Sequence, residues 1–244
     1  MSVPTAPIGQ ALVAGNRLVR TLATHAPQEA AWLTACLEPV TLEVGAVLAG
    51  VGERFTHVYF PETAVISLIS HMADGAAIEV GTVGSEGVAG LAVFLEAEAS
   101  TNETVAQIPG RASRIAAADF MEGLQASPEL RRLLNRYTHA YLTQVAQTAA
   151  CNGVHKIEAR CARWLLMTHD RVDEAAHFPL IQKYLAIMLG VQRSGVSAAS
   201  GALQDAGLIR YSRGEIQVLD RAGLEAAACE CYGVVRRHFD RLLP

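Results

Sequence analysis

Four polar side chains gather where a slender helix is predicted to begin, and their chemistry suits contact with nucleic-acid bases. They are Gln192, Arg193, Ser194 and Ser197. Amide, guanidinium and hydroxyl groups can donate to the acceptor atoms that base pairs expose in the major groove. The neighbouring residues are mostly glycine, alanine and serine, and so slim a helix suits a groove about 12 Å wide. We predict that these four side chains face base edges.

A second group of polar residues is expected to hold the phosphates beside that groove. It comprises Gln182, Lys183, Ser200, Arg210 and Arg213. Phosphate contacts fix the register of a protein on a duplex and carry no sequence information. The run Arg236-Arg237-His238 is interpreted mainly as a solvated helix face, with phosphate contact as the alternative.

Two helices and a hairpin are needed to position these side chains. Apolar residues between 179 and 189 predict a first helix, and Gly190 stands where a helix end favours positive φ. The second helix is expected to bury Val196, Ala199 and Leu203. Residues 207–219 have the pattern of a β-hairpin that turns at 212–214. The sequence therefore predicts a winged helix-turn-helix; the alternative is a helical hairpin beside an unrelated β-ribbon.

The first half of the chain changes from a helical to an alternating pattern. A helix is predicted over residues 8–37, and short β-rich runs follow as far as residue 116. Turn residues separate these runs at intervals of about 8–12 residues, which is typical of β-barrels and double-sheet rolls. Asp74-Gly75, between two such runs, predicts a hairpin. We predict an α+β protein that begins with a double-stranded β-roll, or jelly roll.

A long helix is predicted from Pro128, with Ser127 as its N-cap. Heptad spacing marks one face of it: Leu130, Leu134, Tyr137, Tyr141, Gln144 and Thr148. Such a seam is typical of a dimerisation helix, and the alternative is an amphipathic helix packed on its own chain. The predicted division is an effector domain over 1–127, a dimerisation helix and linker over 128–153, and a winged-helix domain over 154–244.

Composition excludes several classes of protein. With 51% hydrophobic and 18% charged residues, the chain can bury a core, so it is not intrinsically disordered. Its apolar stretches are shorter than the ~20 residues of a membrane span, its N-terminus lacks a secretory pattern, and its cysteines are scattered. We expect a cytoplasmic protein without a membrane partner.

Charge divides unevenly along the chain. Residues 1–127 carry five basic and thirteen acidic side chains, whereas residues 128–244 carry fifteen basic and eleven acidic ones. A basic second half suits a module that binds a polyanion, attached to an acidic half with another task. This division agrees with double-stranded DNA, the partner that the helix-turn-helix pattern predicts.

The order of these parts resembles the Crp/Fnr family of bacterial transcription regulators. Leu189-Gly190-Val191-x-Arg193-x-x-Val196 is similar to the family's helix-turn-helix signature, and residues 159–166 resemble the helix before it. The resemblance implies a cyclic-nucleotide-binding-like effector domain and a homodimer on a palindromic operator, with contacts to RNA polymerase. It also implies that Arg193 grips guanine O6 and N7. Ser194 and Ala198 replace two base-contacting residues of the family, which predicts a different operator.

The effector half departs from that resemblance. Gly90 stands where the cyclic-nucleotide branch has its ribose-binding glutamate, and Ser100-Thr-Asn102 replaces its phosphate-binding arginine. We expect a ligand other than cyclic AMP, or none, in a candidate effector pocket marked by Gly84, Gly87, Gly90 and Thr101. The iron–sulfur branch requires several N-terminal cysteines, and this region has only Cys36.

No cofactor, catalytic residue or metal ligand is predicted, and the effector ligand stays unidentified. Cys229-Glu-Cys231 is interpreted mainly as two packing residues on different sides of a short helix, with soft-metal or redox chemistry as the alternative. An enzyme is not expected, because His57 and His71 lack the closely spaced partners of a metal centre. The alternatives are a small-molecule enzyme on a β-roll and a protein-interaction module.

Overall fold

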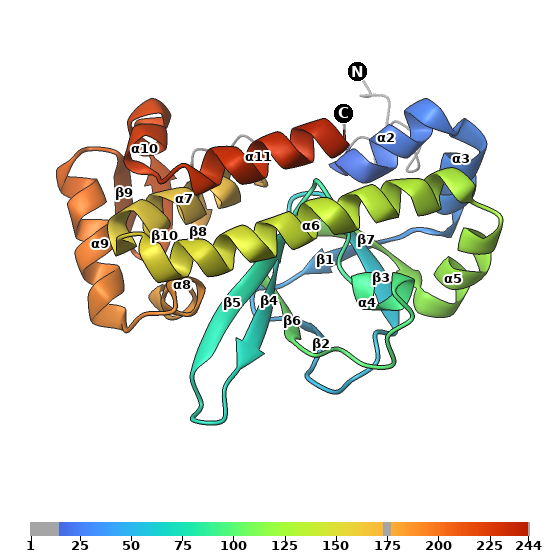
Figure 1. Ribbon diagram of the computed structural model, residues 1–244, viewed down its shortest axis with the longest axis horizontal. Coiled ribbons are helices and arrows are strands. Elements are labelled where there is room, and N and C mark those ends of the chain that lie inside the picture. The colour runs from blue at the N-terminus through green and yellow to red at the C-terminus, as the bar shows by residue number, and fades with distance from the viewer. Residues whose placement is uncertain (1–14, 173–176, 244) are drawn as a thin grey trace, which may run out of the picture.

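Residues 15–37 hold two helices that are tied to the body of the protein. The computed structural model describes residues 15–172 and 177–243 (Figure 1). Instead of one helix over 8–37, it has α2 (Arg17–His25) and α3 (Pro27–Cys36), because Pro27 starts a new helix. Residues 8–14 of the prediction lie outside the described residues. Asn16 caps α2, and its side-chain amide donates to the carbonyls of Pro61 and Gly87 at 2.8 and 2.9 Å.

Two antiparallel sheets follow and confirm the predicted β-roll. Their strands are β1 (Glu38–Leu42), β2 (Val47–Ala49), β3 (His57–Pro61), β4 (Val65–His71), β5 (Ala77–Val83), β6 (Glu103–Ile108) and β7 (Gly110–Ala116). One sheet has the order β1-β7-β3 and the other β2-β6-β4-β5. The short helix α4 (Leu91–Phe94) lies between β5 and β6, and α5 (Ala117–Gln125) follows β7. Phe60, Ile66 and Ile115 are fully buried in this core.

The hairpin of β4 and β5 turns where the sequence predicts. Asp74 accepts a hydrogen bond from the Ala76 amide at 3.0 Å, and Gly75 adopts a φ of 85°. That left-handed conformation is easiest for glycine, which explains the Asp-Gly pair. The hairpin projects away from the body of the protein (Figure 1).

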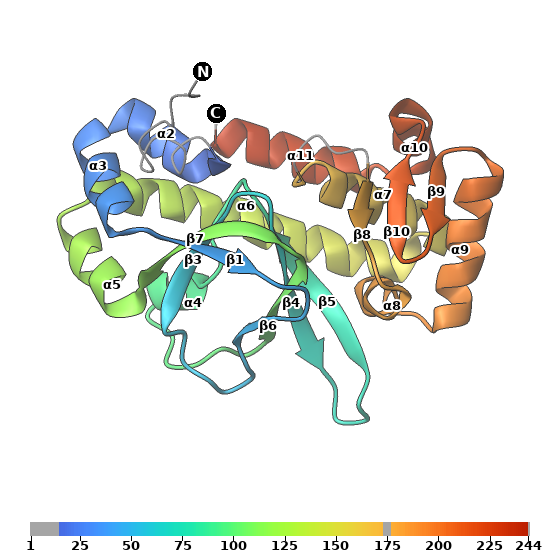
Figure 2. The ribbon, with the colours of Figure 1, turned by 180° about the vertical axis from the view of Figure 1, so that it is seen from behind.

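The predicted long helix is α6 (Pro128–Val154), which crosses the whole molecule (Figures 1 and 2). It ends at Val154, one residue beyond the predicted boundary at 153. Ser127 makes no side-chain cap, because Glu29 of α3 accepts from the amides of Glu129 and Leu130 at 3.3 and 2.9 Å instead. A neighbouring helix thus supplies the acceptors that the first turn requires.

The assignment of the heptad face of α6 to a partner chain is wrong in this structure. Leu130, Leu134, Tyr137 and Gln144 are fully buried within the chain, Tyr141 is buried, and Thr148 is partly exposed. Gln144 donates to the Thr82 carbonyl of β5 at 2.8 Å, and Tyr137 stacks near Phe239 with ring centroids 6.1 Å apart. The heptad pattern therefore reflects packing of α6 on the roll and on the C-terminal helix of the same chain. This is the alternative that the sequence left open.

The C-terminal part confirms the predicted winged helix-turn-helix. Its elements are α7 (Ile157–His169), β8 (His177–Pro179), α8 (Gln182–Leu189), α9 (Arg193–Asp205), β9 (Ile209–Ser212), β10 (Glu215–Val218), α10 (Arg221–Ala227) and α11 (Cys231–Leu242). The strand β8 was not predicted and pairs with β10. The helix α11 returns along α6 towards α2, where Asp240 meets Arg17 at 3.0 Å (Figure 1).

None of the described helices combines the length and the apolarity that a membrane crossing needs.

Candidate nucleic-acid interface and a cysteine–histidine cluster

The turn between α8 and α9 presents the start of α9 at the surface. Gly190 ends α8 with φ 58° and ψ 42°, the left-handed conformation predicted for it. The buried face of α9 holds Val196, Ala199 and Leu203, as expected. This packing turns the opposite face of the helix outward.

All four residues predicted to read bases are exposed on that outward face. Gln192 forms the N-cap of α9, and Arg193, Ser194 and Ser197 lie within its first two turns. Within the described residues no hydrogen bond or ion pair is found for the Arg193 guanidinium. Ser197 donates to the Arg193 carbonyl at 3.1 Å yet stays exposed. The surface therefore offers a long planar donor beside short polar groups.

Four of the five predicted phosphate ligands are also exposed. Gln182 and Lys183 form the first turn of α8, where free amides and the helix dipole favour an anion. Arg213 lies at the tip of the β9–β10 hairpin with a φ of 53°, and Arg210 donates to Gln217 at 3.2 Å on the same hairpin. A hollow of about 370 Å³ is lined by Gln182, Arg213 and their neighbours.

Ser200 is the exception, and the prediction that it binds a phosphate is wrong. Its side chain is only 3% exposed, and its hydroxyl donates to the Val196 carbonyl at 2.8 Å. A serine can satisfy its hydroxyl on the preceding turn of its own helix, which lets it pack like a small apolar residue. Ser200 therefore belongs to the buried face of α9.

The four residues predicted to mark an effector pocket do not line a common open space. A side chain at Gly84 would meet Arg171, and one at Gly87 would meet Tyr137, in each case below 3 Å. Gly90 adopts a φ of 101° beside the backbone of β3, and Thr101 is exposed and donates to Asn102. The space beside Gly84 and Gly87 is thus filled by the chain's own side chains.

A buried polar network joins the roll to α6 and the segment after α7. Arg171 donates to Glu86 at 2.8 Å and to Gln144 at 3.0 Å. Burial alone would lower the pKa of Arg171, but the charge of Glu86 and its hydrogen bond raise it, so the guanidinium stays protonated. The pair therefore provides a charged link between the two halves of the chain.

Glu79 of β5 is the second carboxyl in this region. It accepts from Thr82 at 2.9 Å and from Trp164 of α7 at 3.1 Å. Burial raises the pKa of Glu79 above its ordinary value, although these hydrogen bonds and the one from Ser67 oppose the shift. Glu79 thus links the roll to α7 through hydrogen bonds inside the protein.

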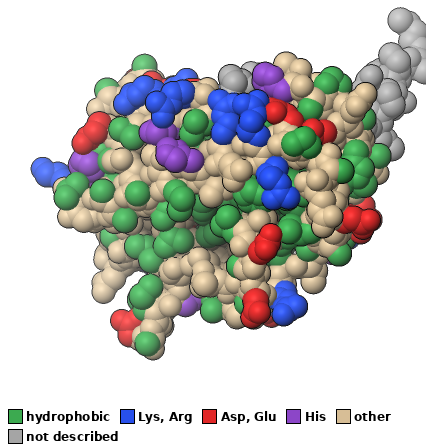
Figure 3. Space-filling model, turned by 45° about the vertical axis from the view of Figure 1, so that its right-hand side comes forward, with side chains coloured by type: hydrophobic (Ala, Val, Ile, Leu, Met, Phe, Trp, Pro, Cys, Tyr) green, Lys and Arg blue, Asp and Glu red, His purple; other side chains and the backbone are tan. Residues whose placement is uncertain are grey.

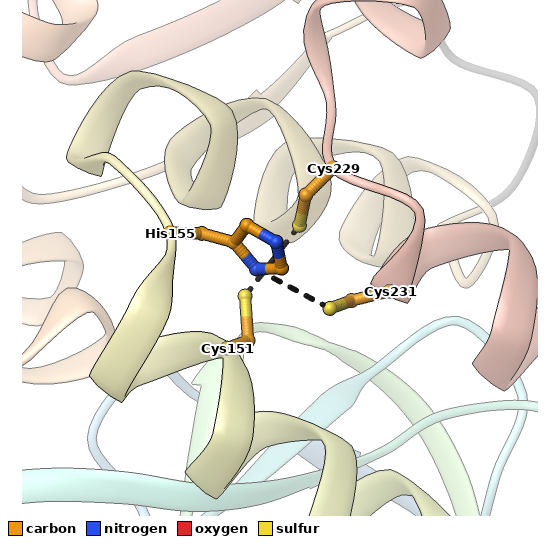
Figure 4. Close-up of side chains that lie close together, drawn as sticks. All are labelled: Cys151, His155, Cys229 and Cys231. Carbon is orange, nitrogen blue, oxygen red and sulfur yellow. Dashed lines mark hydrogen bonds between the residues drawn. The ribbon is translucent and has the colours of Figure 1, made fainter.

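Three cysteines and a histidine meet where α6 ends (Figure 4). Cys151 and His155 come from the last turn of α6, and Cys229 and Cys231 from the junction of α10 and α11. The Cys151 and Cys229 sulfurs are 3.5 Å apart, and the Cys231 sulfur is 3.5 Å from His155 Nδ1. These four residues could hold a metal ion.

A hydrogen bond joins the Cys151 and Cys229 thiols of this cluster. It lowers the pKa of Cys151, with a further contribution from the charge of Arg163, and raises the pKa of Cys229. The two thiols therefore do not ionise independently of each other.

Sequence reasoning weighed only half of this cluster. It considered the Cys229–Cys231 pair and placed the two side chains on different sides of a helix, which is wrong. Cys229 precedes α11 and Cys231 begins it, so both sulfurs turn towards Cys151. The spacing Cys151-x-x-x-His155 was the available signal, because residues four apart share one face of a helix.

Comparisons with known proteins agree with this description. The family description "Crp-like helix-turn-helix domain" matches residues 159–227. FixK2 from Bradyrhizobium japonicum superposes with a TM-score of 0.68 at 17% identity, covering 79% of this chain and 98% of that one. No protein of the curated collection matches.

Two other solved structures have the same fold. A CRP-family transcriptional regulator from Thermus thermophilus gives a TM-score of 0.63 at 21% identity, covering 78% of this chain and 96% of that chain. The c-di-GMP responsive global regulator CLP of Xanthomonas campestris gives 0.62 at 16%, covering 79% and 98%. The chain therefore carries a Crp-like helix-turn-helix domain within the fold of the Crp/Fnr regulators, which confirms the resemblance found in its sequence.

Proposed function

We propose that this protein is a sequence-specific DNA-binding transcription regulator that acts as a homodimer on a palindromic operator. The observation that carries the proposal is the exposed start of α9, where Arg193 stands among short polar side chains with no partner among the described residues. Gln182 and Arg213 line one hollow, Lys183 follows in the first turn of α8, and we assign these three side chains to the DNA phosphates. Base contacts would specify the site and phosphate contacts would fix the register.

Salt dependence separates this proposal from a protein-interaction module. Binding of a labelled duplex, followed by fluorescence anisotropy, should weaken linearly with the logarithm of salt concentration. Each neutralised phosphate contributes about −0.9 to that slope. A complex that is insensitive to salt would contradict DNA binding through Lys183, Arg210 and Arg213.

The dimer surface that we propose is the exposed face of α6. Its residues follow alternating steps of four and three: Asn135, His139, Leu142, Ala146, Ala149 and Gly153. Leu142 is 61% exposed, and the small side chains after it would let a second helix approach closely. This is the spacing of a coiled-coil seam, now on the side of α6 that the chain itself does not cover. Hydrophobic side chains also gather across the middle of the face in Figure 3. A second copy of the chain is the occupant to which this surface is assigned.

Leu142→Glu tests this surface, because it would place two carboxylates at the centre of the seam. Sedimentation should show a dimer for the unaltered protein and a monomer for the variant. Leu95→Glu is the matched control, since Leu95 is 58% exposed but lies on the roll. A dimer that survives Leu142→Glu would place the interface elsewhere.

We propose further that the roll takes no cyclic AMP. Arg171 and Tyr137 fill the space beside Gly84 and Gly87, and the loop over residues 100–102 supplies no arginine for a phosphate. Calorimetry should therefore give no heat with cyclic AMP. Micromolar affinity would contradict this part of the proposal and leave the DNA-binding part unaffected.

A further inference from the structure

We propose that Cys151, His155, Cys229 and Cys231 bind one Zn²⁺ ion in a closed tetrahedral site. Three thiolates and one imidazole are a donor set typical of structural zinc. The donors already lie together, because the four ligand atoms are all within 4.8 Å of one another. This site lies outside the proposed DNA interface and does not depend on the proposed function.

The distances within the cluster suit a single ion. With Zn–S bonds of about 2.3 Å, tetrahedral geometry places neighbouring sulfurs about 3.8 Å apart. The Cys151 and Cys229 sulfurs are 3.5 Å apart, and the Cys231 sulfur is 3.5 Å from His155 Nδ1. All the ligand atoms lie within 4.8 Å of one another, so their separations need to close by no more than about 1 Å to surround the ion.

The same distances disfavour an iron–sulfur cluster. Such a cluster places several irons and inorganic sulfides between its thiolates, so its protein ligands must be spread widely. Here all four donors surround one point, and Cys151, Cys229 and Cys231 are buried. A site with four protein ligands also leaves no position open for a substrate, which is the pattern of a structural metal.

The residues around the cluster would support a bound metal. Glu230 lies 3.4 Å from His155 Nε2, the ring nitrogen that faces away from the sulfurs. A carboxylate in that position fixes the tautomer and orientation of a metal-binding imidazole. Gln147 donates to the Cys231 sulfur at 3.0 Å, as expected beside a thiolate. Arg163, which donates to Thr148 at 2.9 Å, supplies positive charge near Cys151.

Zinc at this site would fasten two distant segments together. It would bind the last turn of α6 to the start of α11, which then runs back along α6 to the N-terminal helices (Figures 1 and 4). The ion would thereby hold the C-terminal part of the chain in a fixed position on α6.

Metal content is the direct test. The full chain, purified under reducing conditions without chelator, should contain one zinc per chain by elemental analysis. Cys151→Ser, Cys229→Ser, Cys231→Ser and His155→Asn should each lose most of it, whereas Cys36→Ser, outside the cluster, should keep it. Iron or copper in place of zinc would overturn the assignment, as would a Cys151–Cys229 disulfide found by mass spectrometry in the freshly purified protein.

Cobalt reconstitution keeps the proposal testable if a ligand variant fails to fold. Unaltered protein stripped of metal and titrated with Co²⁺ should develop the visible absorption of tetrahedral cobalt–thiolate coordination, saturating at one equivalent. Excess Zn²⁺ should abolish this absorption. Titration without such bands, in protein whose circular dichroism is native, would overturn the proposal.

Glu230→Gln tests the supporting contact separately. Loss of a carboxylate that orients a metal-binding histidine typically weakens affinity about 10–100-fold. Because Glu230 is largely exposed, we expect a loss of zinc affinity near the lower end of this range, about tenfold, in a competition with a chelator. Exposed Glu225, which pairs with Arg221 at 3.1 Å, is the matched control as Glu225→Gln. Equal zinc affinities in the two variants would contradict the role of Glu230.

Discussion

The start of α9 and the wing expose their polar side chains, whereas the roll buries two carboxyls and pairs them within the chain. At the start of α9, Arg193 and Ser194 are exposed, and the wing tip extends Arg213 into solvent. In the roll, Glu79 and Glu86 are buried and bonded to Trp164 and Arg171 of the same chain. A surface that binds DNA needs open donors, whereas the two buried carboxyls of the roll already have donors within the chain.

This difference bears on regulation. Arg171 and Tyr137, which occupy the space beside Gly84 and Gly87, are both almost fully buried. The network that would have to move also contacts Gln144 of α6. A change at Arg171 would therefore reach the roll and α6 together.

Arg171→Met should have the largest effect, because it breaks the link between the two halves. The change leaves Glu86 buried without its cation, and disruption of a buried ion pair costs about 3–5 kcal/mol. Urea unfolding should report this loss. The double variant with Glu86→Gln should recover part of it, and a loss below about 1 kcal/mol for the single variant would mean that the pair does not hold the halves together.

Arg193→Ala should have the next largest effect, and only on DNA binding. Loss of a bidentate contact to guanine should cost about 1–3 kcal/mol of binding free energy and relax one base position. Arg54→Ala, an exposed arginine on the roll, is the control for net charge. Equal losses on specific and random duplexes would show that Arg193 does not read a base.

Glu79→Gln should stabilise the protein at neutral pH. Because burial raises the pKa of Glu79, the folded state binds more protons than the unfolded state above the ordinary carboxyl pKa of 4.5. The free energy of unfolding therefore falls as pH rises from 4.5 through the raised pKa, and the variant should lose this decline. Thermal unfolding between pH 4.5 and 8 measures it, with exposed Glu98→Gln as control. A variant that unfolds earlier at pH 7 would show that the carboxylate stabilises the contact.

Arg213→Gln should have the smallest effect, equal on all sequences. Arg213 is placed for a phosphate, so its loss should weaken specific and random duplexes alike and reduce the salt slope by about 1. Binding titrations at several salt concentrations would give both values. A loss confined to one sequence would mean that the wing reads bases.

Local patterns in the sequence were enough to predict much of this molecule. Gly190, Asp74-Gly75 and Pro128 each mark a boundary that depends on backbone chemistry, and the structure confirms all three. These signals involve neighbouring residues only, so they need no knowledge of distant packing.

Features that depend on distant packing could not be predicted in this way. A heptad of Leu130 and Tyr137 marks a buried helix face, but the sequence does not say whether the covering element belongs to a partner or to the same chain. The cysteine–histidine cluster joins residues 78 positions apart, Cys151 and Cys229, which only the return of the chain to the end of α6 brings together. Ser200 shows the same limit on a smaller scale, because its burial depends on what covers α9.

In vitro selection of random duplexes, with no effector added, tests the central claim most directly. The proposal predicts a two-fold palindrome whose half-sites lie about 34–36 Å apart, one turn of the double helix. Arg193→Ala should lose one conserved base in each half-site. Failure to enrich any sequence, together with no binding at low salt, would contradict the assignment of α9 as a DNA-reading helix.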